Sequence, residues 1–389
     1  MKTSVSQRAP RLVALLALAL ATLSVSNLSA QNATVVTTPV GYVGLTITAG
    51  SVAAPKYTAV NLPLIDGVLH RGTISAVTGN ATVTVSSNVT ETFSVLTSNP
   101  NPALLKLTSG SHAGRTFVIN SNAGSTLTLN NDGTALDTLT PSLSVGASGD
   151  QFVIYGADTL NNYFGNRTFG NVTASSFTSA RGNAQAAQAD QVWVWNPTSS
   201  AYVKYYYYKN GDGTGNWRSA GFNTVSDNTI LRPDQGILYL RRGATSLTLD
   251  TTGEVPLVGT KVRIRDSGST YIGSAIPAST TLSGLGLQSR ASWVSANQTT
   301  NPNAAAVAAL DQVWVWNTAS SSFTKYYWNS KAVGAQASGW RAAGFNTAAN
   351  PTLAVGTPVF IKKGATGQTS FTTVSLDLPA NYAPLAITQ

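Results

Sequence analysis

The sequence lacks cysteine altogether, and its 389 residues include only two histidines. Without disulfides, burial of apolar side chains must hold the domains together. A lipoprotein anchor is also excluded, because no cysteine follows the apolar stretch of the N-terminus. His70 and His112 are predicted to lie in different hairpins as solvated surface residues. Nothing in their spacing indicates the convergence with carboxylates that a histidine metal site or a catalytic triad requires.

Carboxylates are also sparse. Glu91 and Glu254 are the only glutamates, and a glycosidase requires two carboxylates across a cleft. Asp190 and Asp311 recur at the same place in two similar segments, which favours a role in the fold, as caps of a turn before a strand. We therefore expect no catalytic residue, no metal, no cofactor and no enzymatic activity. A secreted polysaccharide-active enzyme ranks third among the functional hypotheses.

Only 10% of the residues are charged, whereas glycine numbers 34, a composition that favours turn-rich β-structure over helices. Removing three basic residues of a predicted signal leaves 21 basic and 15 acidic residues, a net charge of +6 instead of +9. The sequence has no run of lysine and arginine longer than a pair. We therefore expect no nucleic-acid partner.

The N-terminus has the pattern of a secretion signal. Lys2, Arg8 and Arg11 precede the apolar stretch Leu12–Val25, and Leu28-Ser29-Ala30 forms a small-residue cleavage site. The apolar stretch is shorter than the roughly 20 residues that a membrane-spanning helix needs. We predict that residues 1–30 are a signal peptide cleaved near Ala30. The protein is then secreted, periplasmic or on the cell surface, with no transmembrane helix after cleavage.

The chain contains an internal repeat. The stretch Asp190–Asn196 (Asp-Gln-Val-Trp-Val-Trp-Asn) returns unchanged as Asp311–Asn317, 121 residues later. The blocks that follow also match in order and spacing: Tyr202–Tyr206 with Phe323–Tyr327, Trp217–Asn223 with Trp340–Asn346, and Ile237–Thr245 with Pro358–Thr366. A weaker match pairs Tyr163-Phe164-Gly165 with Tyr271-Ile272-Gly273. Self-similarity at a fixed period indicates a repeat architecture.

The repeated blocks have strand chemistry. In Val192–Trp195, alternation places the valines on one face of a strand and the tryptophans on the other. The loop 196–200 joins this strand to an aromatic strand as a hairpin. We predict an all-β fold with an N-terminal hairpin-rich β module (31–150), a first β-sandwich- or barrel-like repeat (151–259), and a second with a C-terminal tail (260–389).

Two hairpins are predicted in the N-terminal module. Thr73–Val77 and Ala81–Ser86 flank Thr78-Gly79-Asn80, and Arg115–Asn120 and Ser125–Leu129 flank residues 121–124. Phe152–Tyr155 is assigned as the first strand of the first repeat. The alanine-rich stretches 183–189 and 303–310 are predicted as helices of two turns at most, or as extended loops.

These blocks, together with Thr38–Val43, resemble an uncharacterised family of exported bacterial β-repeat proteins. The resemblance covers most of the chain after the signal. It implies an exported protein of a Gram-negative bacterium. The family has no assigned activity, so the resemblance transfers no catalytic residues.

The repeated aromatic residues are the candidate ligand-stacking site. They would suit sugar rings, whose apolar faces stack on flat aromatic side chains. Alternatively, they fill the cores of the two repeats; this interpretation is favoured. The set comprises Trp193, Trp195, Tyr205, Tyr207, Trp217, Trp314, Trp316, Tyr326, Trp328 and Trp340.

Two further patterns have simple structural explanations. Adjacent strand residues point to opposite faces, so Arg241-Arg242 and Lys362-Lys363 do not form a compact basic patch. One residue of each pair is interpreted as a charge that guards a sheet edge. Asn210–Asn216 alternates oxygen-bearing residues with glycine, as calcium loops do, but lacks the distal glutamate. We interpret it as a hairpin tip.

The leading hypothesis is an exported, non-enzymatic structural or cell-surface β-repeat protein. The runner-up is a carbohydrate-binding or adhesive protein that uses the repeated aromatic residues. Candidate partners are polysaccharides or other envelope components, with self-association as a further option.

Overall fold

The computed structural model describes residues 39–96, 100–131, 135–164, 179, 183–209, 215–265, 268–274, 276–364, 371–379 and 382. All of them belong to one unit, Pro39–Pro384. The signal-peptide prediction and most of the candidate calcium loop lie outside the described residues. Within the described part of the chain, no helix combines the length and apolar character needed to cross a membrane.

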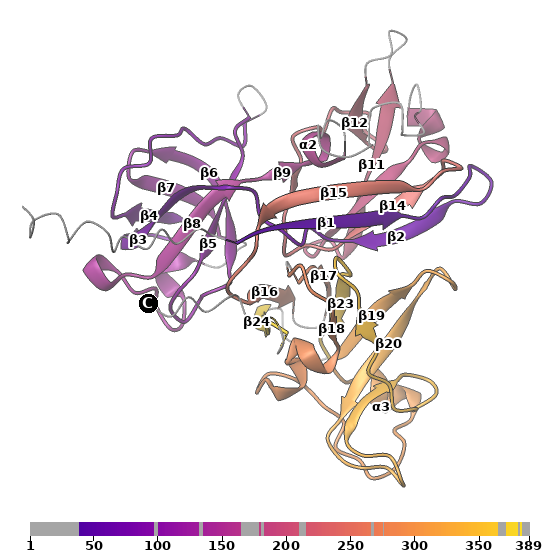
Figure 1. The fold of residues 1–389 in the computed structure, drawn as a ribbon. Helices are drawn as coiled ribbons and strands as arrows, with labels where there is room; N and C mark the ends of the chain where they lie inside the picture. The colour runs from indigo at the N-terminus through magenta and orange to yellow at the C-terminus, as the bar shows by residue number, and fades with distance from the viewer. Residues whose placement is uncertain are drawn as a thin grey trace, which may run out of the picture. The chain divides into compact units, whose positions relative to one another are not determined.

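The all-β prediction is confirmed. Short apolar runs bounded by glycine, asparagine and serine form strands, and the helices are short (Figure 1). The alanine-rich stretches form a six-residue 3-10 helix, η4 (Asn183–Gln188), and a five-residue α-helix, α3 (Ala304–Ala308). Helix α2 (Leu160–Phe164) also has five residues. Four 3-10 helices have three residues each: η1 (Leu136–Thr138), η2 (Gly146–Ser148), η5 (Ser283–Leu285) and η6 (Leu287–Ser289).

A closed barrel occupies the N-terminal part of the chain, in the order β3-β4-β7-β6-β5-β8. Its core contains Ile74, Phe117 and Phe152, all about 1% exposed. Both predicted hairpins are present, and the second turns at residues 124–125, later than predicted. The strands are β3 (Val68–Thr78), β4 (Thr82–Val85), β5 (Ala103–Leu107), β6 (Thr116–Ala123), β7 (Thr126–Asn130) and β8 (Gln151–Gly156).

Two five-stranded sheets follow the same plan. Sheet one has the order β12-β11-β10-β14-β2, and sheet two has the order β21-β20-β19-β23-β17. The strands of sheet one are β2 (Lys56–Val60), β10 (Gln191–Asn196), β11 (Ala201–Lys209), β12 (Gly215–Ser219) and β14 (Ile237–Arg241). Those of sheet two are β17 (Ser269–Ile272), β19 (Gln312–Asn317), β20 (Ser322–Asn329), β21 (Gly339–Ala342) and β23 (Val359–Lys362).

Two-stranded pairs complete each plan. Strand β1 (Val40–Ile47) pairs with β15 (Leu247–Glu254), drawn as neighbouring ribbons in Figure 1, and β16 (Thr260–Arg265) pairs with β24 (Phe371–Leu376). Strand β9 (Asp158–Thr159) pairs with β13 (Ile230–Leu231), as β18 (Thr280–Thr281) pairs with β22 (Thr352–Leu353). Residues of β1, β15 and sheet one share one apolar core, and residues of β16, β24 and sheet two share another.

The strand pairing places the domain boundaries differently from the prediction made from the sequence. Strands β1 and β2 fall in the range 31–150, yet they pair with β15 and β14 of the range 151–259. The barrel strands are therefore an insertion between β2 and β9. The corresponding strands of the second repeat, β17 and β18, follow each other directly in the chain. The assignment of Phe152–Tyr155 to the first repeat is wrong, because β8 closes the barrel against β3 and β5.

Two details of the repeat alignment also need correction. Tyr163 and Phe164 lie in helix α2, whereas Tyr271 and Ile272 lie in β17, whose counterpart is β2. The closing blocks are offset by one residue. Gln191 lies opposite Leu240, and its counterpart Gln312 lies opposite Lys362, so Arg241 corresponds to Lys363.

Candidate functional site

The ten predicted stacking residues divide between cores and an interface. Tyr207, Trp217 and Trp340 are at most 3% exposed and sit in the two repeat cores. Tyr205 packs against the first core, and Tyr326 and Trp328 against the second. The remaining four, Trp193, Trp195, Trp314 and Trp316, are half-buried in one aromatic cluster. None of the ten is classed as exposed.

The cluster joins sheet one to sheet two; we call it the aromatic interface. Besides the four tryptophans it contains Tyr57, Ala59, Tyr202, Leu238, Tyr271, Phe323 and Phe360. Tyr271 stacks on Phe360 with ring centroids 4.3 Å apart, and Trp195 meets the same Phe360 edge-on at 4.9 Å. Offset and edge-to-face pairs at these distances contribute beyond the area they bury. Trp195 and Trp316 therefore reach the other sheet, Trp316 by an edge-on contact with Tyr57 at 5.7 Å. The ring contacts of Trp193 and Trp314 are with residues of their own sheet.

The contacts across the aromatic interface are reciprocal. Trp195 Nε1 donates to the carbonyl oxygen of Ser269 at 2.8 Å, and Trp316 Nε1 donates to that of Tyr57 at 3.3 Å. Strand pairing makes Ser269 and Tyr57 equivalent positions of β17 and β2. Two backbone bonds repeat the exchange: Gly273 N donates to Asp234 O at 3.1 Å, and Asn61 N donates to Gly356 O at 3.0 Å.

A lysine covers the face of an indole in each sheet. Lys204 Nζ lies 4.1 Å from the ring centroid of Trp193, and Lys325 Nζ lies 4.5 Å from that of Trp314. Both lysines are directly opposite their tryptophans on the neighbouring strand. A cation over an indole is attracted by the ring quadrupole. A sugar would have to displace these lysines to stack there.

The repeated aspartates form buried ion pairs. Asp190 pairs with Arg241 and Asp311 pairs with Lys363, and all four side chains are nearly inaccessible. Each aspartate also accepts a backbone N–H, from Arg242 at 2.6 Å and from Gly364 at 2.7 Å. This geometry gives the aspartates a role in the fold, but as partners of buried cations and not as the predicted caps of a turn before a strand. The edge-guard interpretation of the basic pairs is wrong, because β14 and β23 lie inside their sheets.

The two histidines do not form a site together. His112 is 6% exposed, with Nε2 2.6 Å from the carbonyl oxygen of Pro141, so its prediction as a surface residue is wrong. His70 is half-buried, with Nε2 3.0 Å from Ser87 Oγ. Within the described ranges, no cluster of three or more His, Cys, Asp or Glu residues is placed to hold a metal.

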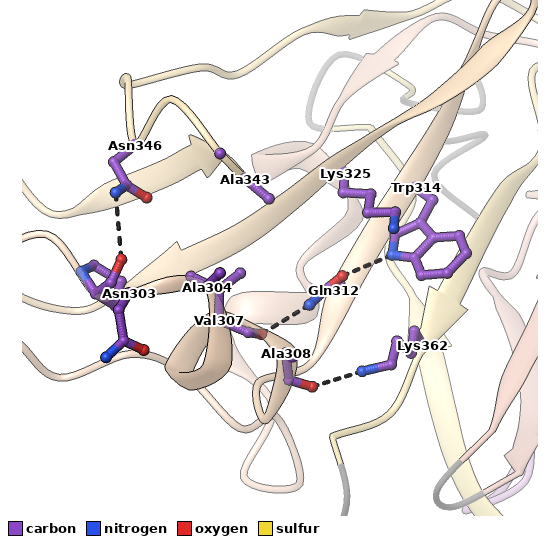
Figure 2. Close-up of a pocket in the computed structure, with 12 residues that line it drawn as sticks. Asn303, Ala304, Val307, Ala308, Gln312, Trp314, Lys325, Ala343, Asn346 and Lys362 are labelled. Carbon is purple, nitrogen blue, oxygen red and sulfur yellow. Dashed lines mark hydrogen bonds between the residues drawn. The ribbon is translucent and has the colours of Figure 1, made fainter.

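A pocket of about 510 Å³ lies in sheet two beside helix α3 (Figure 2). Trp314 and Gln312 of β19, Lys325 of β20 and Lys362 of β23 contribute to its walls, and α3 closes one side. Gln312 ties the wall together: it accepts from Trp314 Nε1 at 2.8 Å and donates to Val307 O at 2.8 Å. The volume lies within the range of small-ligand pockets, about 300–1,000 Å³.

The pocket is cationic. Lys325 and Lys362 are the charged residues among those that line it, and no acidic side chain is among them. Lys362 Nζ donates to the carbonyl oxygen of Ala308 at 2.6 Å. Burial and the nearby Lys325 lower the pKa of Lys362, opposed by Asp311. Because Asp311 is buried and paired with Lys363, it does not neutralise the pocket.

A large aromatic side chain stands at the rim of the pocket. Phe345 is 82% exposed and lies between Gly344 and Asn346, both of which line the pocket. Its counterpart in sheet one, Phe222, is 81% exposed. The turn geometry is matched: φ is +94° at Gly221 and +93° at Gly344, a region that favours glycine. Each turn thus holds its phenylalanine outward.

Sequence reasoning matched the Gly-Phe-Asn turns but did not single out their phenylalanines. A bulky apolar residue inside a Gly-Asn turn, preserved in both repeats, was the available signal. The pocket itself had no such signal, because Gln312, Lys325 and Lys362 come from three strands.

Comparison with models of known protein families finds no match, and comparisons with curated proteins and with solved structures find none either.

Proposed function

We propose that this chain is an exported, non-enzymatic structural β-repeat protein of the cell envelope or extracellular matrix. One observation carries the proposal: the most prominent repeated residues, Trp195 and Trp316, are used to lock one sheet to the other through reciprocal hydrogen bonds. Their aromatic surface is directed toward the partner sheet and not toward solvent. Duplicated residues with these contacts stabilise the association of the two sheets, as expected of a structural protein.

The proposal is tested by expressing the wild-type chain and the Trp195→Ala and Trp316→Ala variants in a Gram-negative bacterium. We expect wild-type protein to be retained in the insoluble envelope or matrix fraction, and both variants to be depleted there in parallel with their loss of stability. A matched Phe222→Ala variant, changed at an exposed position, should be retained. Hydrolytic or lyase activity of purified residues 31–389 on polysaccharides would contradict the proposal.

A second candidate function is carbohydrate binding, and a different feature favours it. The exposed ring of Phe345 lies beside a cationic pocket, and one of the repeated tryptophans, Trp314, is part of the wall of that pocket. An apolar ring surface next to polar donors suits a sugar, which has an apolar face and a polar rim. Retention of residues 31–389 on one insoluble polysaccharide, lost in Phe345→Ala, would support it. Retention that is lost only when the tryptophans are replaced would not.

A further inference from the structure

We infer that the pocket of sheet two binds the carboxylate group of an acidic sugar, a uronic acid residue of an anionic polysaccharide. The inference rests on the carbohydrate-binding candidate and adds the charge of its ligand. The features that carry it are the two lysines of the pocket, the exposed ring at its rim, and the residues that differ in sheet one.

The lysines indicate the sign of the ligand. Lys325 and Lys362 come from β20 and β23, on either side of β19, and contribute to the same 510 Å³ pocket. Two ammonium groups in one pocket repel each other, and a bound anion relieves that repulsion. Lysine recognises a carboxylate as a point charge with three donors, through short charge-assisted hydrogen bonds.

The rim indicates a ring-shaped ligand. The Phe345 side chain is 82% exposed and lies in the chain between Gly344 and Asn346, which line the pocket; Figure 2 shows Asn346 on the side of α3. A sugar ring whose carboxylate reached Lys325 or Lys362 would meet this aromatic surface with its apolar face. Asn303 also lines the pocket; its Oδ1 accepts from Ala306 N at 2.8 Å, which leaves the amide NH2 as a donor for a hydroxyl group of the sugar.

Sheet one provides an internal comparison. It has the counterparts Lys204 and Phe222, but Leu240 stands where sheet two has Lys362. A lysine at this position is thus specific to sheet two, whereas the nearby cation of sheet one, Arg242, donates to the carbonyl oxygen of Ala189. If the lysine pair is required, affinity for an acidic sugar belongs to sheet two alone.

The test uses residues 31–389 and isothermal titration with a galacturonic acid hexamer and with its methyl ester, which keeps the sugar backbone but removes the charge. We expect the acid to bind, and the ester to bind at least tenfold more weakly. Binding of the acid should weaken as the salt concentration rises, because the contacts are ionic.

Matched variants locate the site. Lys325→Ala and Lys362→Leu should each weaken binding at least tenfold, and Phe345→Ala should weaken it several-fold. The counterparts Lys204→Ala and Phe222→Ala should leave affinity within twofold of wild type. Lys325 is exposed, so Lys325→Ala keeps the test open if Lys362→Leu fails to fold.

Three results would overturn the inference. Equal binding of acid and ester, lost in Phe345→Ala, would leave carbohydrate binding standing and remove the requirement for a carboxylate. Equal losses in the sheet-one and sheet-two variants would place the site elsewhere. Absence of binding to either hexamer would reject the acidic-sugar site. None of these results bears on the structural proposal, which depends on retention of the chain and on its stability.

Discussion

Sheet one and sheet two share the contacts that stabilise their cores and join the two sheets. They differ in the contacts made by the residues around each sheet. In both sheets the aromatic hairpin has one further strand on one side and, on the other, a closing strand followed by a strand from earlier in the chain. Both also contain a buried ion pair of an aspartate with a cation. Both contribute one tryptophan that bonds to the other sheet. The features common to both are therefore those that build the cores and the aromatic interface.

The two sheets differ in the barrel contact beside sheet one and in the pocket of sheet two. Between β13 and β14, Arg232 and Asp234 form an ion pair at 2.8 Å, and Arg232 donates to the carbonyl oxygen of Thr116 in the barrel at 2.9 Å. The corresponding residues after β22 are Ala354 and Gly356, and no barrel is inserted there. In sheet two, Lys362 replaces Leu240 and supplies the second cation of the pocket. Residues that match in the two repeats stabilise the fold. Residues that differ between the repeats are the candidates for a function specific to one sheet.

The largest expected effect comes from removing the shared ion pairs. Asp190→Ala and Asp311→Ala each leave a buried cation without its partner, which costs about 3–5 kcal/mol of unfolding free energy. Urea denaturation followed by circular dichroism measures this loss. An exposed carboxylate serves as control, and Asp137→Ala should change stability by less than about 0.5 kcal/mol. A loss confined to one of the two aspartates would break the equivalence of the sheets.

The next effect concerns the interface tryptophans. Trp195→Ala and Trp316→Ala each remove a half-buried indole and its hydrogen bond, so we expect similar losses of about 2–4 kcal/mol. The same denaturation experiment detects them, and Phe345→Ala, at an exposed ring, is the comparison. Full stability in either tryptophan variant would mean that the aromatic interface does not hold the sheets together.

A third prediction uses pH and concerns the barrel, which is inserted in the first repeat and has no counterpart beside sheet two. Burial lowers the pKa of Lys106, in barrel strand β5, to about 8, partly opposed by Asp234 of the sheet-one region. Between pH 8 and pH 10 the unfolded lysine keeps its proton while the folded one loses it, so the contribution of this lysine to stability rises with pH over this window. The rise is on the order of 2 kcal/mol.

Lys106→Met should remove this contribution, seen as the difference between the two proteins in a pH series of denaturation curves. Below pH 8 both states are protonated, and this lysine contributes no slope. Ionisation of tyrosines in the unfolded state, which begins below pH 10, acts in the opposite direction in both proteins, because burial raises the pKa of Tyr202 and Tyr271. Parallel profiles of wild type and Lys106→Met from pH 8 to pH 10 would contradict the prediction.

The smallest effect exchanges equivalent residues. Tyr202 and Phe323 occupy matching positions on the two aromatic strands. The Tyr202 hydroxyl is buried without a hydrogen-bond partner among the described residues. Tyr202→Phe should therefore raise stability by up to about 1 kcal/mol, and Phe323→Tyr should lower it. A loss on Tyr202→Phe would show that the hydroxyl is satisfied.

Local sequence patterns predicted the strands and hairpins well, because alternation and turn residues act over a few positions. Val192–Trp195 and the Gly79 turn are examples. The insertion of the barrel was not predictable in this way, since pairing of β1 with β15 joins residues about two hundred positions apart. The one-residue offset between Arg241 and Lys363 was hidden because Arg-Arg-Gly and Lys-Lys-Gly match by eye.

The candidate site was harder to predict for the same reason. Alternation told us that Trp193 and Trp195 share a face, but not that this face meets Tyr271 and Phe360 of the other sheet. The choice between core and exposed platform depended on a contact that the sequence does not encode locally. The pocket depends on three strands whose order becomes known only in the fold.

Hydrogen–deuterium exchange of residues 31–389 tests the central claim most directly, because peptides covering β10 and β19 report separately on the two sheets. The claim is that the aromatic interface makes both sheets one cooperative unit. We predict that Trp316→Ala, a change in sheet two, lowers the protection of β10 in sheet one as much as that of β19. Loss of protection in β19 alone, with β10 unchanged, would contradict the account.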